Sequence, residues 1–198
     1  MRALLLPLLF VCLLAEAAPY TEVEPHPGDA HRVYLFFAFH CPFCRERHAL
    51  FERWGESLPE PFVFEAVPVL ALKEDIPLAR AYYAASMADP EKLPLFVELL
   101  YEAVIEHGLS PDEEALFGLA REAGIPGEAF STAWKSREGM EKLIRARYLL
   151  ESYPVTSTPA LAIAGRYVLS PEHTRGDYGL FFKVANGLIS MILEGGKP

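Results

Sequence analysis

Positive charge is scarce in this chain, since 18 Lys and Arg residues stand against 27 Asp and Glu residues among 198. The resulting formal charge of −9 argues against nucleic acid as a partner. Long charge runs, low-complexity tracts and internal repeats are also missing. What the chain does have is a hydrophobic fraction of 52%, which is enough to bury the core of one domain, or of one domain with a large insertion.

The longest apolar run, residues 3–14, is too short to cross a bilayer comfortably, because about 20 residues are needed. It follows a positively charged start and precedes the sequence AEA at residues 15–17, a small-x-small pattern typical of signal-peptide cleavage. We therefore predict that residues 1–17 are a signal peptide and that the mature protein reaches the periplasm. Cys12 would be lost with this segment, which leaves two cysteines in a compartment where disulfides form and persist.

The order of strand and helix patterns along the rest of the chain predicts an α/β fold. Strand signals occur at residues 33–39, 62–69, 160–164 and 167–169, and helices are predicted from residue 42 and over residues 177–193. Between these groups, residues 76–152 carry only helical patterns. We therefore predict a sheet domain formed by residues 18–75 and 153–198, interrupted by an all-helical insertion.

The two remaining cysteines, Cys41 and Cys44, lie two residues apart where the first strand gives way to a helix. A structural disulfide closing so short a loop would remove little unfolded-state entropy. Haem attachment would need His in place of Arg45. A zinc site needs about four ligands, and no second cysteine pair exists. The histidines near the pair show no matching spacing: His26, His31, His40 and His48. We favour the fourth alternative, a redox-active dithiol, because Cys-x-x-Cys beside a strand–helix unit is typical of thioredoxin-like proteins.

The start of the helix predicts different roles for the two cysteines. Cys41 is expected at the N-cap, with Pro42 at the first helical position. Unpaired amides and the helix dipole stabilise negative charge at this end, so the pKa of Cys41 should be lowered. We expect Cys41 to be the exposed, attacking thiolate and Cys44 the buried, resolving cysteine. His40 adds positive charge nearby, whereas the two arginines of the first turns are expected to be solvated.

These features together resemble the DsbA family of periplasmic thiol:disulfide oxidoreductases, over nearly the whole predicted mature chain. The matching stretches are FFAFHCPFC at residues 36–44, PLF at residues 94–96, AGIPGEAFSTAW at residues 123–134 and TPALAIAGRYVLSP at residues 158–171. A single CxxC motif is weak evidence for a family, but these stretches in this order are specific. The resemblance implies a thioredoxin-like fold with a helical insertion.

The resemblance also implies a function and a second part of the site. Pro159 would be a cis proline facing the dithiol, and we expect Thr158, Pro159, His40 and Phe43 to bind substrate. The Cys41–Cys44 disulfide would be donated to reduced or unfolded secreted proteins through a mixed disulfide on Cys41. A DsbB-like, quinone-dependent membrane protein would reoxidise the dithiol, and no metal or other cofactor is expected. The alternatives are a reductase or isomerase with the same site, and a chaperone-like binding module without turnover.

The sequence departs from the family pattern at four positions that bear on the redox potential. Phe43 stands where strong oxidants of the family have His between the cysteines. Leu35 and Phe64 stand where the family often has a buried Glu and its Lys partner, and losing both charges together is far less costly than losing one. Thr158 replaces the common Val before the proline. These changes leave the thiol chemistry intact but leave the potential and the net direction open.

Overall fold

The computed structural model describes residues 18–195, so the predicted signal peptide lies outside the described residues. A mixed five-stranded sheet with the order β1-β5-β4-β2-β3 forms its centre. The strands are β1 Thr21–Glu22, β2 Arg32–Phe37, β3 Val63–Pro68, β4 Ala160–Ile163 and β5 Tyr167–Leu169. β2 and β3 are parallel, and the other neighbouring strands are antiparallel. The short edge strand β1 falls in a segment where the sequence predicts no regular structure.

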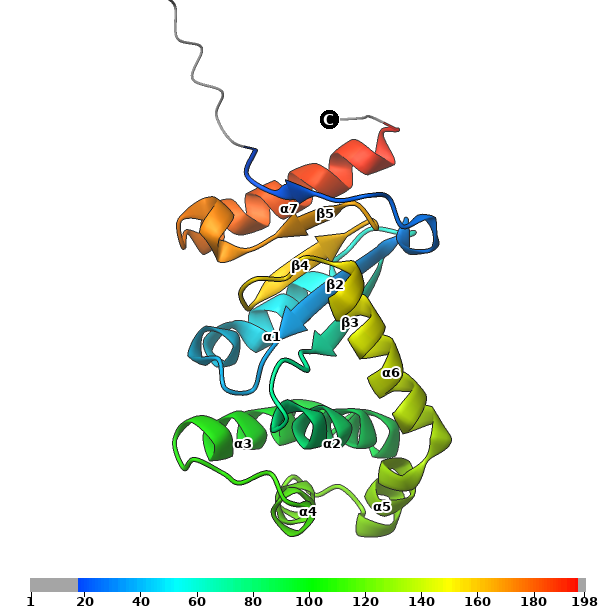
Figure 1. Ribbon diagram of the computed structural model, residues 1–198, viewed down its shortest axis with the longest axis vertical. Helices are drawn as coiled ribbons and strands as arrows, with labels where there is room; N and C mark the ends of the chain where they lie inside the picture. The colour runs from blue at the N-terminus through cyan, green and yellow to red at the C-terminus, as the bar shows by residue number, and fades with distance from the viewer. Residues whose placement is uncertain (1–17, 196–198) are drawn as a thin grey trace, which may run out of the picture.

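Two groups of helices surround the sheet. α1 (Pro42–Glu56) and α7 (Tyr178–Leu193) lie behind it in Figure 1 and pack on each other, with the Phe51 and Phe181 rings 5.7 Å apart. The helices between β3 and β4 are α2 Asp75–Ala88, α3 Leu93–Ile105, α4 Glu113–Glu122, α5 Gly127–Lys135 and α6 Arg137–Ser152. Figure 1 shows α2 to α5 as a separate layer below the sheet. The next helix, α6, runs from this layer back to the sheet. The predicted α/β fold with an all-helical insertion is confirmed.

The central strand β2 is apolar along nearly its whole length because both of its faces are covered. Phe36 packs against Tyr153, which follows α6, with ring centroids 6.1 Å apart. Phe37 points to the other face and packs against His48 of α1 at 4.8 Å and Tyr82 of α2 at 5.4 Å. Aromatic packing on both faces therefore fixes the end of β2, from which the chain runs directly into the two cysteines.

A polar cluster fixes the point where the helical insertion rejoins the sheet. The Tyr34 hydroxyl donates to Asp29 Oδ1 at 2.6 Å, and the Tyr153 hydroxyl donates to Asp29 Oδ2 at 2.7 Å. Arg145 of α6 donates to the Tyr34 oxygen at 2.8 Å. Both tyrosines are buried, so Asp29 is the acceptor for two hydroxyl protons that would otherwise lack one.

Leu35 and Phe64, the two apolar departures from the family, lie in different surroundings. Leu35 is buried in β2 between Ala66 of β3 and Leu161 of β4. Phe64 packs against α1 at Gly55, where a Cβ atom would lie only 2.3 Å from the phenyl ring. Gly55 is eleven residues beyond Cys44, which is roughly 17 Å along a helix. Phe64 therefore supports the far end of α1 rather than the cysteines.

Candidate active site

Cys41 is the N-cap of α1, as the sequence predicts, and Pro42 occupies the first turn. The Cys44 amide donates to the Cys41 sulfur, with N and Sγ 3.3 Å apart. Cys41 and Cys44 are both free thiols, so the structure represents the reduced form. Cys44 is 1% exposed and Cys41 is 9% exposed, so the expected order holds, but Cys41 is far less open than we expected. The reason is the loop before β4, which lies against its sulfur.

The surroundings of the two sulfurs drive their pKa values apart. Hydrogen bonding from the Cys44 side chain is the largest influence lowering the pKa of Cys41 to about 6. The Thr158 side chain and the amides of Cys44 and Phe43 act in the same direction, against the opposing effect of burial. Burial and the neighbouring Cys41 raise the pKa of Cys44 far above its ordinary range. The site can therefore hold one thiolate and one thiol at neutral pH.

The loop before β4 brings Thr158 and Pro159 to the cysteines. The Thr158–Pro159 peptide bond is cis, in agreement with the resemblance. The protonated Cys41 thiol donates to the Thr158 carbonyl oxygen at 3.3 Å, across 117 residues of sequence. Loss of that proton removes this bond, so the carbonyl oxygen becomes available to the backbone of an extended peptide.

His40, the residue before Cys41, has an acidic partner that the sequence did not reveal. Its Nδ1 atom lies 3.2 Å from Oδ1 of Asp75, at the start of α2. The Asp75 side chain is 3% exposed, whereas that of His40 is 47% exposed. An acidic residue at the start of a helix is favourable simply because it interacts with the helix dipole. Only the tertiary structure therefore identifies Asp75 as the partner of His40.

Phe43 borders a groove of about 430 Å³ beside Cys41. The residues lining it are Phe43, Arg47, Ser157, Thr158, Pro171, Glu172, Arg175, Gly176 and Tyr178. Phe43 is 58% exposed, and the Ser157 hydroxyl is buried without a hydrogen-bond partner among the described residues. The groove therefore presents the exposed Phe43 ring beside Thr158, whose carbonyl oxygen contacts the reactive sulfur.

The two arginines of the first turns of α1 are not simply solvated, contrary to our expectation. Arg45 donates to Glu98 of α3 at 2.9 Å and to Glu106, just beyond α3, also at 2.9 Å. The Arg47 guanidinium stacks over Tyr178, 4.1 Å from the ring centroid. Arg45 thereby links the helix carrying the cysteines to the helical insertion.

Within residues 18–195, no group of three His, Cys, Asp or Glu side chains is arranged to hold a metal ion. His48 is instead part of the aromatic core, with Nδ1 3.1 Å from the Tyr101 hydroxyl oxygen, and burial lowers its pKa to about 4. No helix among these residues is long and apolar enough to cross a membrane.

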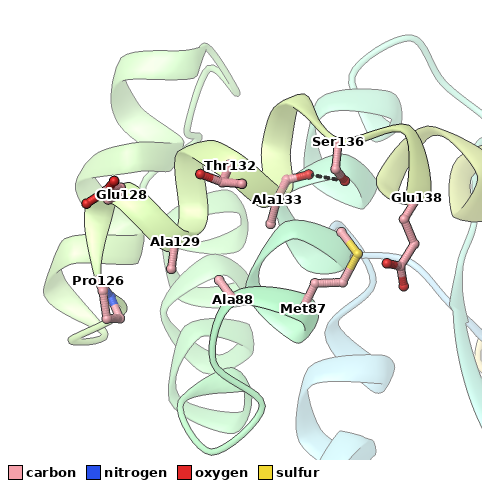
Figure 2. Close-up of a pocket in the computed structure, with 9 residues that line it drawn as sticks. All are labelled: Met87, Ala88, Pro126, Glu128, Ala129, Thr132, Ala133, Ser136 and Glu138. Carbon is pink, nitrogen blue, oxygen red and sulfur yellow. Dashed lines mark hydrogen bonds between the residues drawn. The ribbon is translucent and has the colours of Figure 1, made fainter.

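A second hollow, of about 580 Å³, lies in the helical insertion (Figure 2). Met87 and Ala88 line it from the end of α2, and Ala129 and Thr132 line it from α5. Ser136 at its edge donates to the Ala133 carbonyl oxygen at 2.7 Å, and its Oγ caps α6 by accepting from the Gly139 amide at 2.9 Å. No cysteine or residue of the loop before β4 lines this hollow, so it is separate from the candidate active site.

Comparison with known proteins identifies relatives of this chain. The family model of the DSBA-like thioredoxin domain matches residues 45–176, which is more than half of the chain. The thiol:disulfide interchange protein DsbA of Bordetella parapertussis is 28% identical over 177 residues, covering 87% of this chain and 84% of the relative. The protein of the same name from Bordetella pertussis has the same identity and coverage.

Solved structures show the same fold. The crystal structure of Pseudomonas aeruginosa DsbA matches with a TM-score of 0.78 at 20% identity, covering 90% of this chain and 94% of that one. The crystal structure of Proteus mirabilis DsbA matches with a TM-score of 0.73 at 20% identity, covering 89% of this chain and 97% of that one. These matches confirm the predicted thioredoxin-like fold with a helical insertion.

Proposed function

Because the chain belongs to the DSBA-like thioredoxin domain family and is a thiol:disulfide oxidoreductase, we propose that it works as a dithiol oxidase. In this proposal the Cys41–Cys44 disulfide is donated to reduced proteins. The observation that supports this direction is the pKa of Cys41, lowered to about 6 by hydrogen bonds from Cys44 and Thr158. These bonds stabilise the thiolate of the reduced form, and a stabilised reduced form makes the disulfide a stronger oxidant.

The reaction proceeds by two exchanges at Cys41. A substrate thiolate attacks Cys41 Sγ, the Cys41–Cys44 bond breaks, and Cys44 leaves as a thiolate that takes up a proton. A second substrate thiolate then attacks the substrate sulfur of the mixed disulfide and releases Cys41 as its stabilised thiolate. The substrate is oxidised by two electrons, and the enzyme is reduced by two.

The substrate in this proposal lies extended across Cys41. Thr158 and Pro159 present the backbone carbonyl that accepts from the peptide, while Phe43 and His40 flank the sulfur on the protein surface. The groove beside Phe43 takes the side chain next to the reacting cysteine, and its mostly apolar lining suits unfolded chains. These four residues are therefore the proposed substrate-binding set.

The cellular setting follows from the N-terminal sequence and the family. We assign residues 1–17 to a cleaved signal peptide and place the mature protein in the periplasm, with reduced or unfolded secreted proteins as its substrates. Reoxidation by a DsbB-like membrane protein would complete the cycle. Residues 18–75 and 153–198 then form the thioredoxin-like domain, and residues 76–152 form the helical insertion.

The test measures the direction of disulfide exchange with a peptide and traps the mixed disulfide. Oxidised protein mixed with a reduced two-cysteine peptide should form the peptide disulfide, and Cys41→Ser should abolish the reaction. Cys44→Ser, mixed with a peptide disulfide, should accumulate a mixed disulfide on Cys41. Equilibration with glutathione should give a potential less negative than about −200 mV. A potential near the −270 mV of thioredoxin would instead identify a reductase, and absence of any exchange would leave a binding module.

A further inference from the structure

His40 and Asp75 form a histidine–carboxylate pair directly beside the reactive cysteine. Nδ1 of His40 lies 3.2 Å from Oδ1 of Asp75, and His40 is covalently next to Cys41. The pair joins the loop before α1 to the first residue of α2. About half of the His40 side chain remains accessible to solvent.

Contacts at both of its oxygens hold Asp75 in place to orient the imidazole. Its Oδ2 atom accepts a hydrogen bond from the Leu72 amide at 2.7 Å, and its Oδ1 atom faces His40. Both carboxylate oxygens of this buried side chain therefore have partners. Because Nδ1 of His40 faces Asp75, Nε2 is the ring nitrogen left to accept a proton from a substrate.

Three ionisable residues adjoin this pair in the sequence. Lys73 and Glu74 precede Asp75 in the chain and are exposed, so solvent screens their charges. Cys41 follows His40, and its sulfur is disulfide-bonded and therefore uncharged when the oxidised protein meets a substrate. Asp75 is thus the acidic group in contact with His40.

We propose that His40, oriented by Asp75, is the general base that removes the proton from the incoming substrate thiol. The proposal rests on the oxidase function proposed above. The substrate S–H proton passes to His40 Nε2 as the substrate sulfur bonds to Cys41 Sγ and the Cys41–Cys44 bond breaks. Cys44 departs with the electron pair, and the proton returns from His40 to Cys44 through solvent. His40 is thus a catalytic residue, and Asp75 is a positioning residue.

The need for a base follows from the chemistry of the substrate. A cysteine in an unfolded chain has a pKa of about 8.5, so only about 3% of it is thiolate at pH 7. A base that removes the proton during attack can raise the rate by at most about 30-fold at pH 7, since full ionisation is the limit. At pH 9.5 about nine tenths of the thiol is already ionised, and the advantage disappears.

The experiment measures the second-order rate constant for oxidation of a two-cysteine peptide by the oxidised protein, with acid quenching, from pH 6 to pH 10. His40→Gln should lower this constant by roughly tenfold at pH 7 and leave it unchanged at pH 9.5. Asp75→Asn should lower the rate constant by a smaller factor, with the same pH dependence. Added imidazole should restore much of the rate to a His40→Ala variant. His107→Gln is the matched control, because His107 forms a surface pair with Glu102, 3.7 Å away, and should behave as wild type.

A further variant separates proton transfer from simple electrostatics. His40→Arg keeps a positive charge beside Cys41 but cannot accept a proton, so the proposal expects the same loss as for His40→Gln. A His40→Arg enzyme with the wild-type rate at pH 7, or a His40→Gln deficit that persists at pH 9.5, would overturn the proposal. If the wild-type protein fails to oxidise the peptide at any pH, the proposed oxidase function is wrong, which is a different result.

Discussion

Thr158→Val is the substitution that most directly tests how the protein stabilises its thiolate. Thr158 precedes Pro159, and hydrogen bonding from its side chain is one of the influences that lower the pKa of Cys41. Valine has nearly the same shape but no hydroxyl, so the change removes the hydrogen bond while keeping the packing. We therefore expect the pKa of Cys41 to rise and the disulfide to become a weaker oxidant.

The size of the effect follows from the lowering of the Cys41 pKa to about 6. Relative to a free thiol at about 8.5, this corresponds to about 3.4 kcal/mol before any allowance for solvent. The Thr158 side chain shares that effect with the side chain and amide of Cys44 and the amide of Phe43. Because solvent at the mouth of the site screens such interactions, we expect its removal to raise the pKa by about half to one pH unit.

The sign of the redox change follows from linkage. A lowered thiol pKa stabilises the reduced folded form fully above about pH 8.5, and this stabilisation is lost as the pH falls through about 6. At pH 7 a rise of half to one pH unit in the pKa removes about 0.6–1 kcal/mol of it. With about 1.4 kcal/mol equivalent to 30 mV, the potential should become more negative by about 10–20 mV.

Ultraviolet thiolate absorbance of the reduced protein gives the pKa, and glutathione equilibration gives the potential. Thr156→Val is the matched control, because Thr156 is an exposed threonine in the same loop and should change neither quantity. If Thr158→Val leaves the Cys41 pKa at about 6, the helix terminus and Cys44 alone stabilise the thiolate, and the reasoning about the Thr158 hydroxyl is refuted.

Two further substitutions probe the redox dipeptide and the fold. Phe43→His should make the protein more oxidising by some 30–60 mV in the same glutathione assay, because a charge-assisted hydrogen bond of roughly 1.5–3 kcal/mol can then stabilise the thiolate; an unchanged potential would show that the dipeptide does not control it. Asp29→Ala should lower the free energy of unfolding by about 2–4 kcal/mol in urea, since it leaves the Tyr34 and Tyr153 hydroxyls without their acceptor. Asp29→Asn, which keeps one acceptor oxygen, should lower the free energy of unfolding by less. Equal decreases in the two variants would contradict the role of Asp29 as the acceptor for both hydroxyls.

The elements that local patterns encode could be predicted from the sequence. The N-cap position of Cys41 follows from a strand, a cysteine and Pro42 in succession, and the structure has it there. The hairpin of β4 and β5 and the five helices of the insertion also follow from short-range periodicity. The placement of the loop before β4 beside Cys41 came from the family resemblance, because no local rule places two segments so far apart against each other.

The contacts that could not be predicted are those between segments distant in sequence. Asp75 beside His40, and Glu98 and Glu106 beside Arg45, depend on how the insertion sits against α1. The same is true of the low exposure of Cys41, which results from the loop that covers it. A charged residue on a helix is compatible with solvent or with a partner, so sequence alone favours the solvated alternative in each case.

The contact between Cys41 and Thr158 spans 117 residues, and this has a consequence for biosynthesis. The chain emerges with its cysteines first, and the loop that covers them is made only after the whole helical insertion. Until β4 pairs with β2, the cysteines lack the Thr158 side chain and the closed surface around them. Long-range pairing of this kind is slow compared with helix formation. A newly made chain therefore carries two ordinary thiols for a time, and it acquires the low pKa of Cys41 only as the last part of its sheet assembles.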